Sequence, residues 1–489
     1  MTKQSILSIC SLAVLLSLST PAQADEIYTP TLDKLHQSGT TMPDTSEIYP
    51  ESAYTLTESA QNAENTITLY EKTEIIRYYD PLTGQEVAKS DLQPDIEYKE
   101  VKTIQTTPKY YQVALKQTEY GSGDGEKYFK WENTENGLIL TETDKANAQI
   151  TAKYDTTQFH TRLENTSDNS SMNITGGSFV NQTVGNTSGV KVGGAIYNSG
   201  SSAKLGDISA DFIGNSAIST GGYSAYGGAI YNLVAAIGDI TGNFIGNYAI
   251  SDRSSAAGGA IYNDSGSTIG DITGDFIGNY AASDRSSAKG SAIFNDSGSS
   301  IGSITGNFIG NYAVSGGGET YGGAIYNYNN STIGNITGDF IGNYTVSDRN
   351  CAYGGAIFNG ENSTMADITG NFIGNYISVA GLAHGGAIFN DHNSTIGDIT
   401  GDFIGNYAVS RSGETYGGAI YNENSAKIGV ITGDFIGNYA SSYYYAYGGA
   451  IYNSGTIGNI TGSFINNYAQ TTSDSALALG GAIYTTENL

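Results

Sequence analysis

The chain has 489 residues, a formal net charge of −26 and only 22 lysine and arginine residues. So acidic a chain is repelled by nucleic acid and by anionic lipid surfaces, which excludes a nucleic-acid-binding role. Cys10 and Cys351 are its two cysteines.

Residues 1–24 predict a secretory signal peptide. Lys3 precedes an apolar stretch from Ile6 to Leu18, and small residues follow from Ala22 to Ala24, as expected of a cleavage site before Asp25. The stretch is shorter than the roughly 20 residues that span a bilayer. We therefore expect an exported mature chain that keeps only Cys351 and forms no intrachain disulfide.

Residues 25–150 predict a β-rich leader with a polar, flexible start. The segments "YKEVKTI" and "KYFKWENTENGLILTET" alternate as strands do, and "GSGDGEK" from Gly121 predicts a turn. Two roles stay open: capping the first coil of the following repeats, or acting as a separate binding module. The binding module would offer an aromatic contact surface of Tyr110, Tyr111, Tyr120, Tyr128, Phe129 and Trp131.

From about residue 170 to 489 the chain repeats one unit about every 32 residues, a period typical of solenoid proteins. A Gly-Gly-Ala-Ile phrase recurs at nearly constant intervals, with the variant Gly-Ser-Ala-Ile at Gly290. A second phrase, Phe-Ile-Gly-Asn, alternates with it. The first phrase begins at Gly193, Gly227, Gly258, Gly322, Gly354, Gly385, Gly417, Gly448 and Gly480.

This unit predicts an all-β parallel β-helix of about ten coils. Its glycines, and the lack of apolar residues three to four apart, exclude the helical repeats of similar length. Three short strands per unit, "GGAIYN", "TIGDI" and "DFIGN", fit one coil, with "YAASDRSSA" as a variable loop. All seven prolines lie at or before Pro108, so none interrupts the backbone pairing of the coils.

In-register stacking predicts side-chain ladders, because the same position recurs every 4.7 to 4.9 Å, about one strand spacing. Asn263 and Asn279 represent two amide ladders, with an aromatic stack beside the first. The residue before each repeated Phe alternates, as in Asp275 and Asn307. We expect a solvated ladder there, with a row of calcium sites as the alternative.

The paired phrases resemble the passenger region of the polymorphic outer membrane proteins, an autotransporter family. The resemblance covers roughly residues 170 to 489. It implies a right-handed parallel β-helix that a C-terminal barrel carries across the outer membrane and that is displayed as an adhesin. The residues here that represent the family's structural motif are Gly258, Gly259, Ala260, Ile261, Phe276 and Asn279, with Asn263 as the ladder position beside them.

The chain departs from the family at its end. It stops nine residues after Gly480, midway through a coil, without the barrel strands of an autotransporter. We expect a passenger that is incomplete at its C-terminus. A freely secreted solenoid, or one tethered by another protein, is the alternative.

Catalysis would appear as a local break in the repeat where acids and bases converge. The breaks are instead scattered, so we predict no catalytic, cofactor-binding or metal-binding residues. His384 and His392 flank one strand and would meet at a metal only if the loop folded back. Arginines in the "SDR" loops are expected to pair weakly with their aspartates or to form a weak basic stripe. The breaks are Lys289 with Ser291, Cys351, Met365 and Val430, and the arginines are Arg253, Arg285 and Arg349.

These observations predict an exported, surface-displayed adhesin-like passenger without enzymatic activity or cofactor. Its expected partner is a host-cell protein or glycan receptor. A secreted polysaccharide-cleaving enzyme and a passive surface stalk are the alternatives.

Overall fold

The computed structural model describes residues 118–134, 137–473 and 476–486, together with the backbone of six strands between residues 31 and 114. The signal segment and most of the polar start of the leader lie outside these residues. The six strands form a separate unit, within residues 28–116. In it, β3 (Tyr70–Tyr79) pairs antiparallel with β4 (Glu86–Val87) and β5 (Lys99–Pro108). A second small sheet joins β1 (Thr31–Asp33), β2 (Thr66–Thr68) and β6 (Val113–Ala114).

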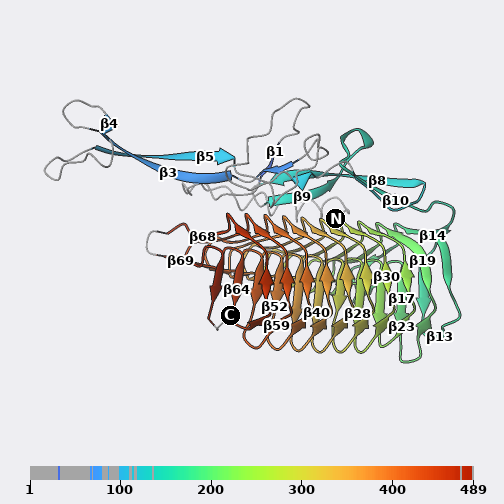
Figure 1. The fold of residues 1–489 in the computed structure, drawn as a ribbon. Coiled ribbons are helices and arrows are strands. Elements are labelled where there is room, and N and C mark those ends of the chain that lie inside the picture. The colour runs from blue at the N-terminus through green and yellow to red at the C-terminus, as the bar shows by residue number, and fades with distance from the viewer. Residues whose placement is uncertain are drawn as a thin grey trace. The chain divides into compact units, whose positions relative to one another are not determined.

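Most of the other unit is a parallel β-helix, as the sequence predicts. Figure 1 shows its coils side by side in chain order. Five parallel sheets run along the stack, and we number them 1 to 5 in the order in which a coil visits them. Sheet 1 has 11 strands, one from each coil, and sheet 3 has 19. The prediction of an all-β parallel β-helix with one coil per repeat unit is confirmed, and the equivalent Asn263 and Asn295 of successive coils lie 32 residues apart.

One coil illustrates the path. It passes through sheets 1 to 5 in turn, with two strands in sheet 3. These strands are β28 (Ile261–Asp264), β29 (Thr268–Ile269), β30 (Ile272–Thr273), β31 (Phe276–Ile277), β32 (Tyr280–Ser283) and β33 (Ala288–Lys289). The stretch "TIGDI" thus makes two strands rather than one, because Gly270 and Asp271 turn the chain from sheet 2 to sheet 3.

The prediction of a variable loop in "YAASDRSSA" is right only for residues 284–287. Its first four residues make β32 and its last residue begins β33, and these strands form a thin arm whose two sheets, 4 and 5, pack through small side chains such as Ala281 and Ala288. The main core, between sheets 1, 2 and 3, is filled by Ile261, Phe276 and their equivalents. Alanine and serine are poor indicators of a strand in a sequence, so only the packing reveals the arm.

The stack also starts earlier than predicted. Three strands before residue 170 pair in parallel with the next coil: β11 (Phe159–His160), β12 (Leu163–Asn165) and β13 (Asp168–Asn169). His160 stands in for the repeated Phe, with its ring 4.9 Å from that of Phe179. This first coil lacks both repeated phrases, so the repeat pattern alone misses it.

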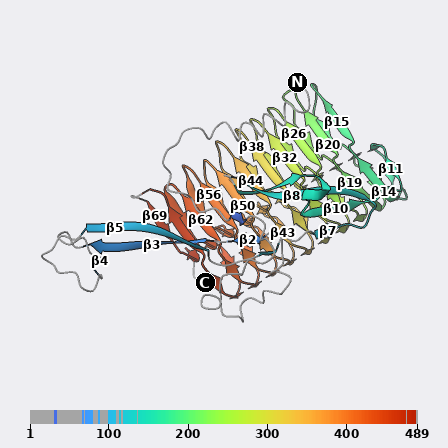
Figure 2. The same ribbon diagram turned by 90° about the horizontal axis from the view of Figure 1, so that it is seen from above.

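A four-stranded sheet precedes the coils in the same unit. Its order is β7 (Thr118–Tyr120), β10 (Ile150–Tyr154), β8 (Gly125–Thr134) and β9 (Gly137–Glu142), and Figure 2 shows β8 and β10 beside the coils. The predicted turn from Gly121 joins β7 to β8. Lys145–Asn147 forms a short 3-10 helix between β9 and β10.

The β8–β9 hairpin packs along the flank of the β-helix. A Cβ atom placed on Gly310 would lie 2.5 Å from Cβ of Leu140, and one on Gly342 would lie 2.6 Å from Cη2 of Trp131. The glycine of Phe-Ile-Gly-Asn therefore leaves room for the hairpin. Phe129 and Trp131 are each only 5% exposed, so the expectation that they form an open contact surface is wrong. Tyr110 and Tyr111 lie outside the described residues.

Candidate functional site

The first predicted ladder is formed by the asparagine of sheet 1. Nδ2 of Asn263 donates to Oδ1 of Asn295 at 2.8 Å, and the same bond links successive coils as far as Asn453, opposite which the last coil has Thr485. Across the nine successive bonds from Asn165 to Asn453 the distances are 2.7–2.9 Å. All these asparagines are buried. The amide groups thus form hydrogen bonds with one another inside the core. This arrangement requires an asparagine at the same position in successive coils.

The second ladder follows the repeated Phe. Nδ2 of Asn279 donates to Oδ1 of Asn311 at 2.9 Å and to the backbone oxygen of Phe244 at 2.9 Å. The backbone N–H of Asn279 also donates to Oδ1 of Asn311. Beside this ladder the Phe276 ring stacks 4.7 Å from that of Phe244. Both amide ladders agree with the sequence prediction, whereas the stack of the repeated Phe beside the second ladder was not predicted.

Gly258 and Gly259 turn the chain sharply between sheets 5 and 1. Gly258 has φ +58°, and a Cβ there would lie 2.4 Å from the backbone oxygen of Ile261. Ala260 and Ile261 then enter the core fully buried. The second glycine position holds a serine once, Ser291, whose hydroxyl donates to the backbone oxygen of Gly323. The first glycine has no such exception.

The outward side chains of sheets 5 and 1 meet on the surface across this double-glycine turn, and we call this region the aromatic corner. Sheet 1 contributes a continuous row of rings, with Tyr262 and Phe294 at 4.5 Å and Phe294 and Tyr326 at 4.9 Å. Sheet 5 contributes half-buried residues, and its Tyr321 meets Tyr326 edge-on at 5.9 Å. The sequence predicts the sheet 1 row but not its contact with sheet 5.

The row in sheet 5 carries a lysine between Ala257 and Tyr321. Lys289 takes the place of a tyrosine, and its Nζ lies 5.4 Å from the ring centre of Tyr321 and 5.2 Å from that of Tyr326. Burial lowers the pKa of Lys289, while the charges of Asp296 and Glu319 oppose that shift. Burial raises the pKa of Asp296 to about 6. This corner of the protein therefore already holds one alkylammonium ion over two aromatic rings.

Three coils further along, the same row carries His384. Its ring lies edge-on to Tyr416, 5.0 Å away, and 4.9 Å from Tyr421. Neither ring nitrogen has a hydrogen-bond partner, and burial lowers the pKa of His384 to about 3. The imidazole is thus neutral and packs as an aromatic ring. By register, Asp391 and Glu414 have the chain positions that Asp296 and Glu319 have relative to Lys289, and the Glu414 carboxylate accepts a hydrogen bond from the Tyr416 hydroxyl.

A further carboxyl group stands beside this second place. Glu423 follows Asn422 of the ladder, directly one coil after Asp391, and the two carboxyl groups share a hydrogen bond. Burial, and then the neighbouring carboxylate, raise the pKa of Glu423 well above its usual range. Glu423 therefore stays protonated at pH values where an exposed glutamate is ionised. Both residues and Glu414 are partly exposed.

The histidine metal site that the sequence left open is not formed. His384 belongs to β51 (Ala383–His384), whereas His392 lies on an exposed turn after β52 (Ile388–Asn390), with Nδ1 3.2 Å from the backbone oxygen of Asn424. Among the described residues, no group of three or more His, Cys, Asp and Glu side chains is placed to hold a metal ion.

The alternating row before the repeated Phe is a third ladder. Nδ2 of Asn307 donates to Oδ1 of Asp275 at 3.0 Å, and the backbone N–H of Asp339 donates to Oδ1 of Asn307 at 3.0 Å. Each asparagine donates to an aspartate and separates it from the next one. This arrangement agrees with the expected ladder as far as Asp402; there Asp434 follows directly in the next coil, and its backbone N–H donates to Oδ1 of Asp402 at 2.8 Å.

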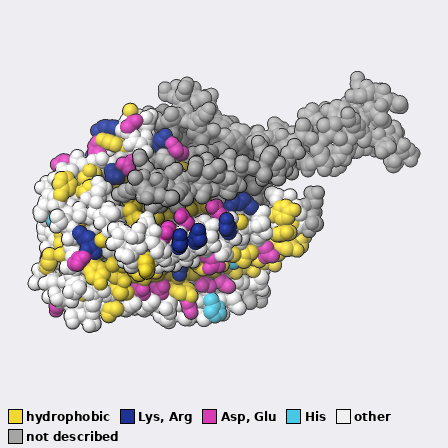
Figure 3. Space-filling model, turned by 180° about the vertical axis from the view of Figure 1, so that it is seen from behind, with side chains coloured by type: hydrophobic (Ala, Val, Ile, Leu, Met, Phe, Trp, Pro, Cys, Tyr) yellow, Lys and Arg dark blue, Asp and Glu magenta, His cyan; other side chains and the backbone are white. Residues whose placement is uncertain are grey.

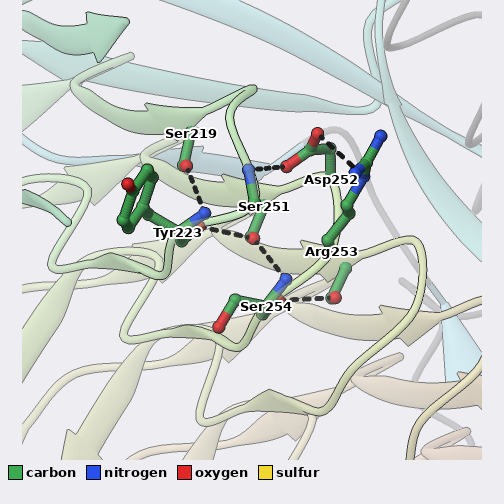
Figure 4. Close-up of polar contacts among 8 residues, drawn as sticks. Ser219, Tyr223, Ser251, Asp252, Arg253 and Ser254 are labelled. Carbon is green, nitrogen blue, oxygen red and sulfur yellow. Dashed lines mark hydrogen bonds and ion pairs between the residues drawn. The ribbon is translucent and has the colours of Figure 1, made fainter. Parts of the chain in front are cut away.

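The loops between sheets 4 and 5 are held by serines (Figure 4). Oγ of Ser251 donates to the backbone oxygen of Tyr223 at 2.8 Å and accepts from the N–H of Ser254 at 2.9 Å. The Asp252–Arg253 pair spans 3.8 Å, with the arginine side chain 65% exposed. Such a pair contributes little, as expected. On the face seen in Figure 3, basic and acidic side chains lie beside one another.

Comparison with protein-family models, with curated proteins and with solved structures found no match. Within the described part of the chain, no helix is long and apolar enough to span a membrane.

The buried His384 makes a testable prediction about acid stability. The pKa of His384 is about 3 in the folded chain and about 6.5 in the unfolded chain. The stability that the neutral imidazole contributes to the fold is therefore fully present above pH 6.5 and is lost as the pH falls toward 3. The loss amounts to about 1.4 kcal/mol per pH unit. His384→Tyr, which restores the usual residue of the row, should therefore retain about 2 kcal/mol more of its pH 7 stability at pH 5 than the wild type does.

Urea unfolding of both proteins at pH 7 and pH 5 measures this difference. His392→Asn is the control, because it removes an exposed imidazole. Equal acid sensitivity of His384→Tyr and the wild type would contradict the burial argument.

Proposed function

We propose that the protein is an exported, surface-displayed, adhesin-like passenger that binds through repeated faces of its β-helix. The observation that carries this proposal is the aromatic corner, where a row of rings runs over successive coils from Tyr197 to Tyr484. The rings from Tyr231 to Tyr421 are buried, and the partly exposed tyrosines of sheet 5 pack beside them. Aromatic side chains with polar tips are the residues that protein interfaces favour. The predicted signal segment and the resemblance to the polymorphic outer membrane proteins support export and display.

The departures from the repeat support a binding role over catalysis. These departures lie at separate places in the fold. Lys289 lies in sheet 5, Ser291 at the glycine turn and Met365 in the buried core, whereas Cys351 and Val430 lie in separate coils. Enzymatic action needs an acid, a base and a substrate clamp gathered at one place. A host-cell protein or glycan is the expected partner.

Deleting residues 322–353 tests the proposal. The deletion removes one full period, and Gly354 then takes the place of Gly322 while Gly374 takes the place of Gly342 beneath Trp131. The shortened protein should fold and keep most of the adhesion of the parent, measured as attachment of protein-coated beads to cultured cells.

A scan of single-unit deletions separates this proposal from the alternatives. An adhesin should lose attachment gradually, in proportion to the surface removed. An enzyme should lose all activity with one particular unit, and cleavage of polygalacturonate by the intact chain would favour that alternative. A chain that folds and is displayed but attaches to nothing would favour the passive stalk.

A further inference from the structure

In the described part of the chain, each of the five sheets begins with a strand that has a neighbour on one side only. Residues 159–165 run from β11 directly to β12 and form no strand of sheets 4 or 5. These two sheets therefore begin one coil later, with β15 (Thr183–Asn186) and β16 (Lys191–Val192). Figure 2 shows β15 at the end of the row of sheet 4 strands. An open sheet edge of this kind is a template for pairing with another chain.

Most of these first strands have features that protect an edge from pairing. Short length and charged side chains are two such features. The strands β11, β13 and β16 have only two residues each. In β12, Glu164 forms an ion pair with Arg162. In β16, Lys191 is a buried lysine in the row that continues with Ala225.

The corner between sheets 5 and 1 has its open backbone groups satisfied by a side chain. In later coils the glycine pair donates to the coil that follows, as the N–H of Gly194 does to the backbone oxygen of Gly227. The second coil has no glycine pair before it. Instead, Arg162 donates from Nε to the backbone oxygen of Gly193 at 2.8 Å and from Nη2 to that of Val192 at 3.3 Å. The fold thus closes this corner by itself.

The strand β15 lacks this protection. It has four residues, more than any of the other four first strands, and none of them is charged. Residues 176–190 around it contain no Asp, Glu, Lys, Arg or His either. The edge of sheet 4 is therefore both longer and less guarded than its neighbours.

The pairing of β15 with β20 (Ser216–Ser219) shows which backbone groups are open. The N–H of Ser216 donates to the backbone oxygen of Gln182 at 2.8 Å, so residues 182, 184 and 186 direct their backbone groups toward β20. Thr183 and Gly185 direct theirs to the other side. Both residues are exposed, so their N–H and C=O groups are accessible to a further strand.

We propose that the open edge of β15 binds an extended, uncharged segment of a partner protein, which adds a strand to sheet 4 beside Thr183 and Gly185. This surface is separate from the aromatic corner and goes beyond the binding proposed there. Peptides bind exposed sheet edges in this way, with main-chain hydrogen bonds giving affinity and alternate side chains giving specificity. The uncharged surroundings of β15 favour an uncharged segment.

The thin arm indicates the side chains of this segment. Val184 begins the inward row that continues with Ala217 and Ala249. Every second side chain of an added strand would lie beside Val184, at the mouth of this narrow space. Small residues such as alanine and serine fit there. The stretch "GNYAIS", residues 246–251 of the chain itself, has this pattern.

A labelled, end-capped peptide of the sequence GNYAIS, titrated with the full chain and followed by fluorescence anisotropy, tests the inference. Gly185→Pro removes an outward N–H at an edge position where proline is tolerated, and it should weaken binding at least about tenfold. Its control is Gly185→Ala, which keeps the N–H. The added Cβ would lie 3.3 Å from the backbone oxygen of Ile218, so this variant reports the effect of the side chain alone and should stay within about twofold.

Two measurements need no protein variant and decide the question if Gly185→Pro does not fold. The same peptide with N-methyl groups on its tyrosine and alanine cannot pair through either edge, and it should bind at least about tenfold more weakly. Hydrogen exchange of the wild type should become slower within residues 182–187 when the unmodified peptide is bound.

Absence of peptide binding would overturn the inference. Equal binding to the wild type and to a folded Gly185→Pro would also overturn it, because the peptide would then bind elsewhere. Self-association of the wild type that Gly185→Pro abolishes, without binding of the peptide, would replace the partner by a second copy of the chain. None of these results depends on cell attachment, so failure here and failure of the adhesin proposal are distinguishable.

Discussion

Replacing Asn343 by leucine is expected to destabilise the β-helix by about 3 kcal/mol or more. Oδ1 of Asn343 accepts the backbone N–H and Nδ2 of Asn311, each at 3.0 Å, and its Nδ2 donates to the backbone oxygen of Phe308 at 2.8 Å. A leucine at this position leaves the backbone N–H of Asn311 and the backbone carbonyl of Phe308 without these partners in the core. Each buried group left unpaired costs about 1 to 3 kcal/mol.

The measurement is the free energy of unfolding from a urea titration followed by circular dichroism. Arg349→Leu is the control, because it places the same side chain at an exposed loop position and should change stability by less than about 0.5 kcal/mol. If both variants lose the same stability, the buried amide ladder does not contribute as described.

Replacing Gly322 by alanine is expected to have an equal or larger effect. Gly322 has φ +55°, a region that costs an L-residue about 1 to 2 kcal/mol. The added Cβ would also lie 2.1 Å from the backbone oxygen of Ile325. Because that oxygen belongs to the rigid entry of sheet 1, the chain cannot move it without disturbing neighbouring coils. We expect a loss of more than about 3 kcal/mol or a failure to fold.

Gly298→Ala separates the two causes. Gly298 has φ +74°, and a Cβ there would meet nothing within 4 Å. This variant should lose only the conformational part, about 1 kcal/mol. Thermal unfolding of both variants provides the comparison. A similar loss in the two would mean that backbone conformation, rather than close approach, explains the glycine of Gly-Gly-Ala-Ile.

The ladders were predictable because their cause is local and repeated. A side chain that recurs at the same position in every stacked coil lies next to a copy of itself, so it must pack or hydrogen-bond favourably with that copy. Asn263 does so by donating to Asn295, and Phe276 does so by stacking on Phe308 at 4.8 Å. The alternation of Asp275 and Asn307 follows from the same rule, because stacked carboxylates repel. These features need only the period and the strand spacing.

The leader and the thin arm were not predictable in this way. Trp131 lies far along the chain from Gly342, on which it packs, and no repeat connects them. Ala281 and Ala288 form strands because two sheets approach closely enough for small side chains to fill the space between them. Both depend on contacts between surfaces, and such contacts have no periodic signal in the sequence.

The sequence alone determined the coil, its period and the identity of the stacked side chains. Each of these follows because every repeat unit stacks on an equivalent unit at a constant spacing. Only the tertiary structure decided that sheets 1 and 5 bring their aromatic rows together. It likewise decided that His384 and Asp391 repeat the surroundings of Lys289 and Asp296 without the cation. The reason is that the turn at Gly258 and its equivalents sets the angle between the strands of sheets 5 and 1, and that angle depends on how the coils pack rather than on any single residue.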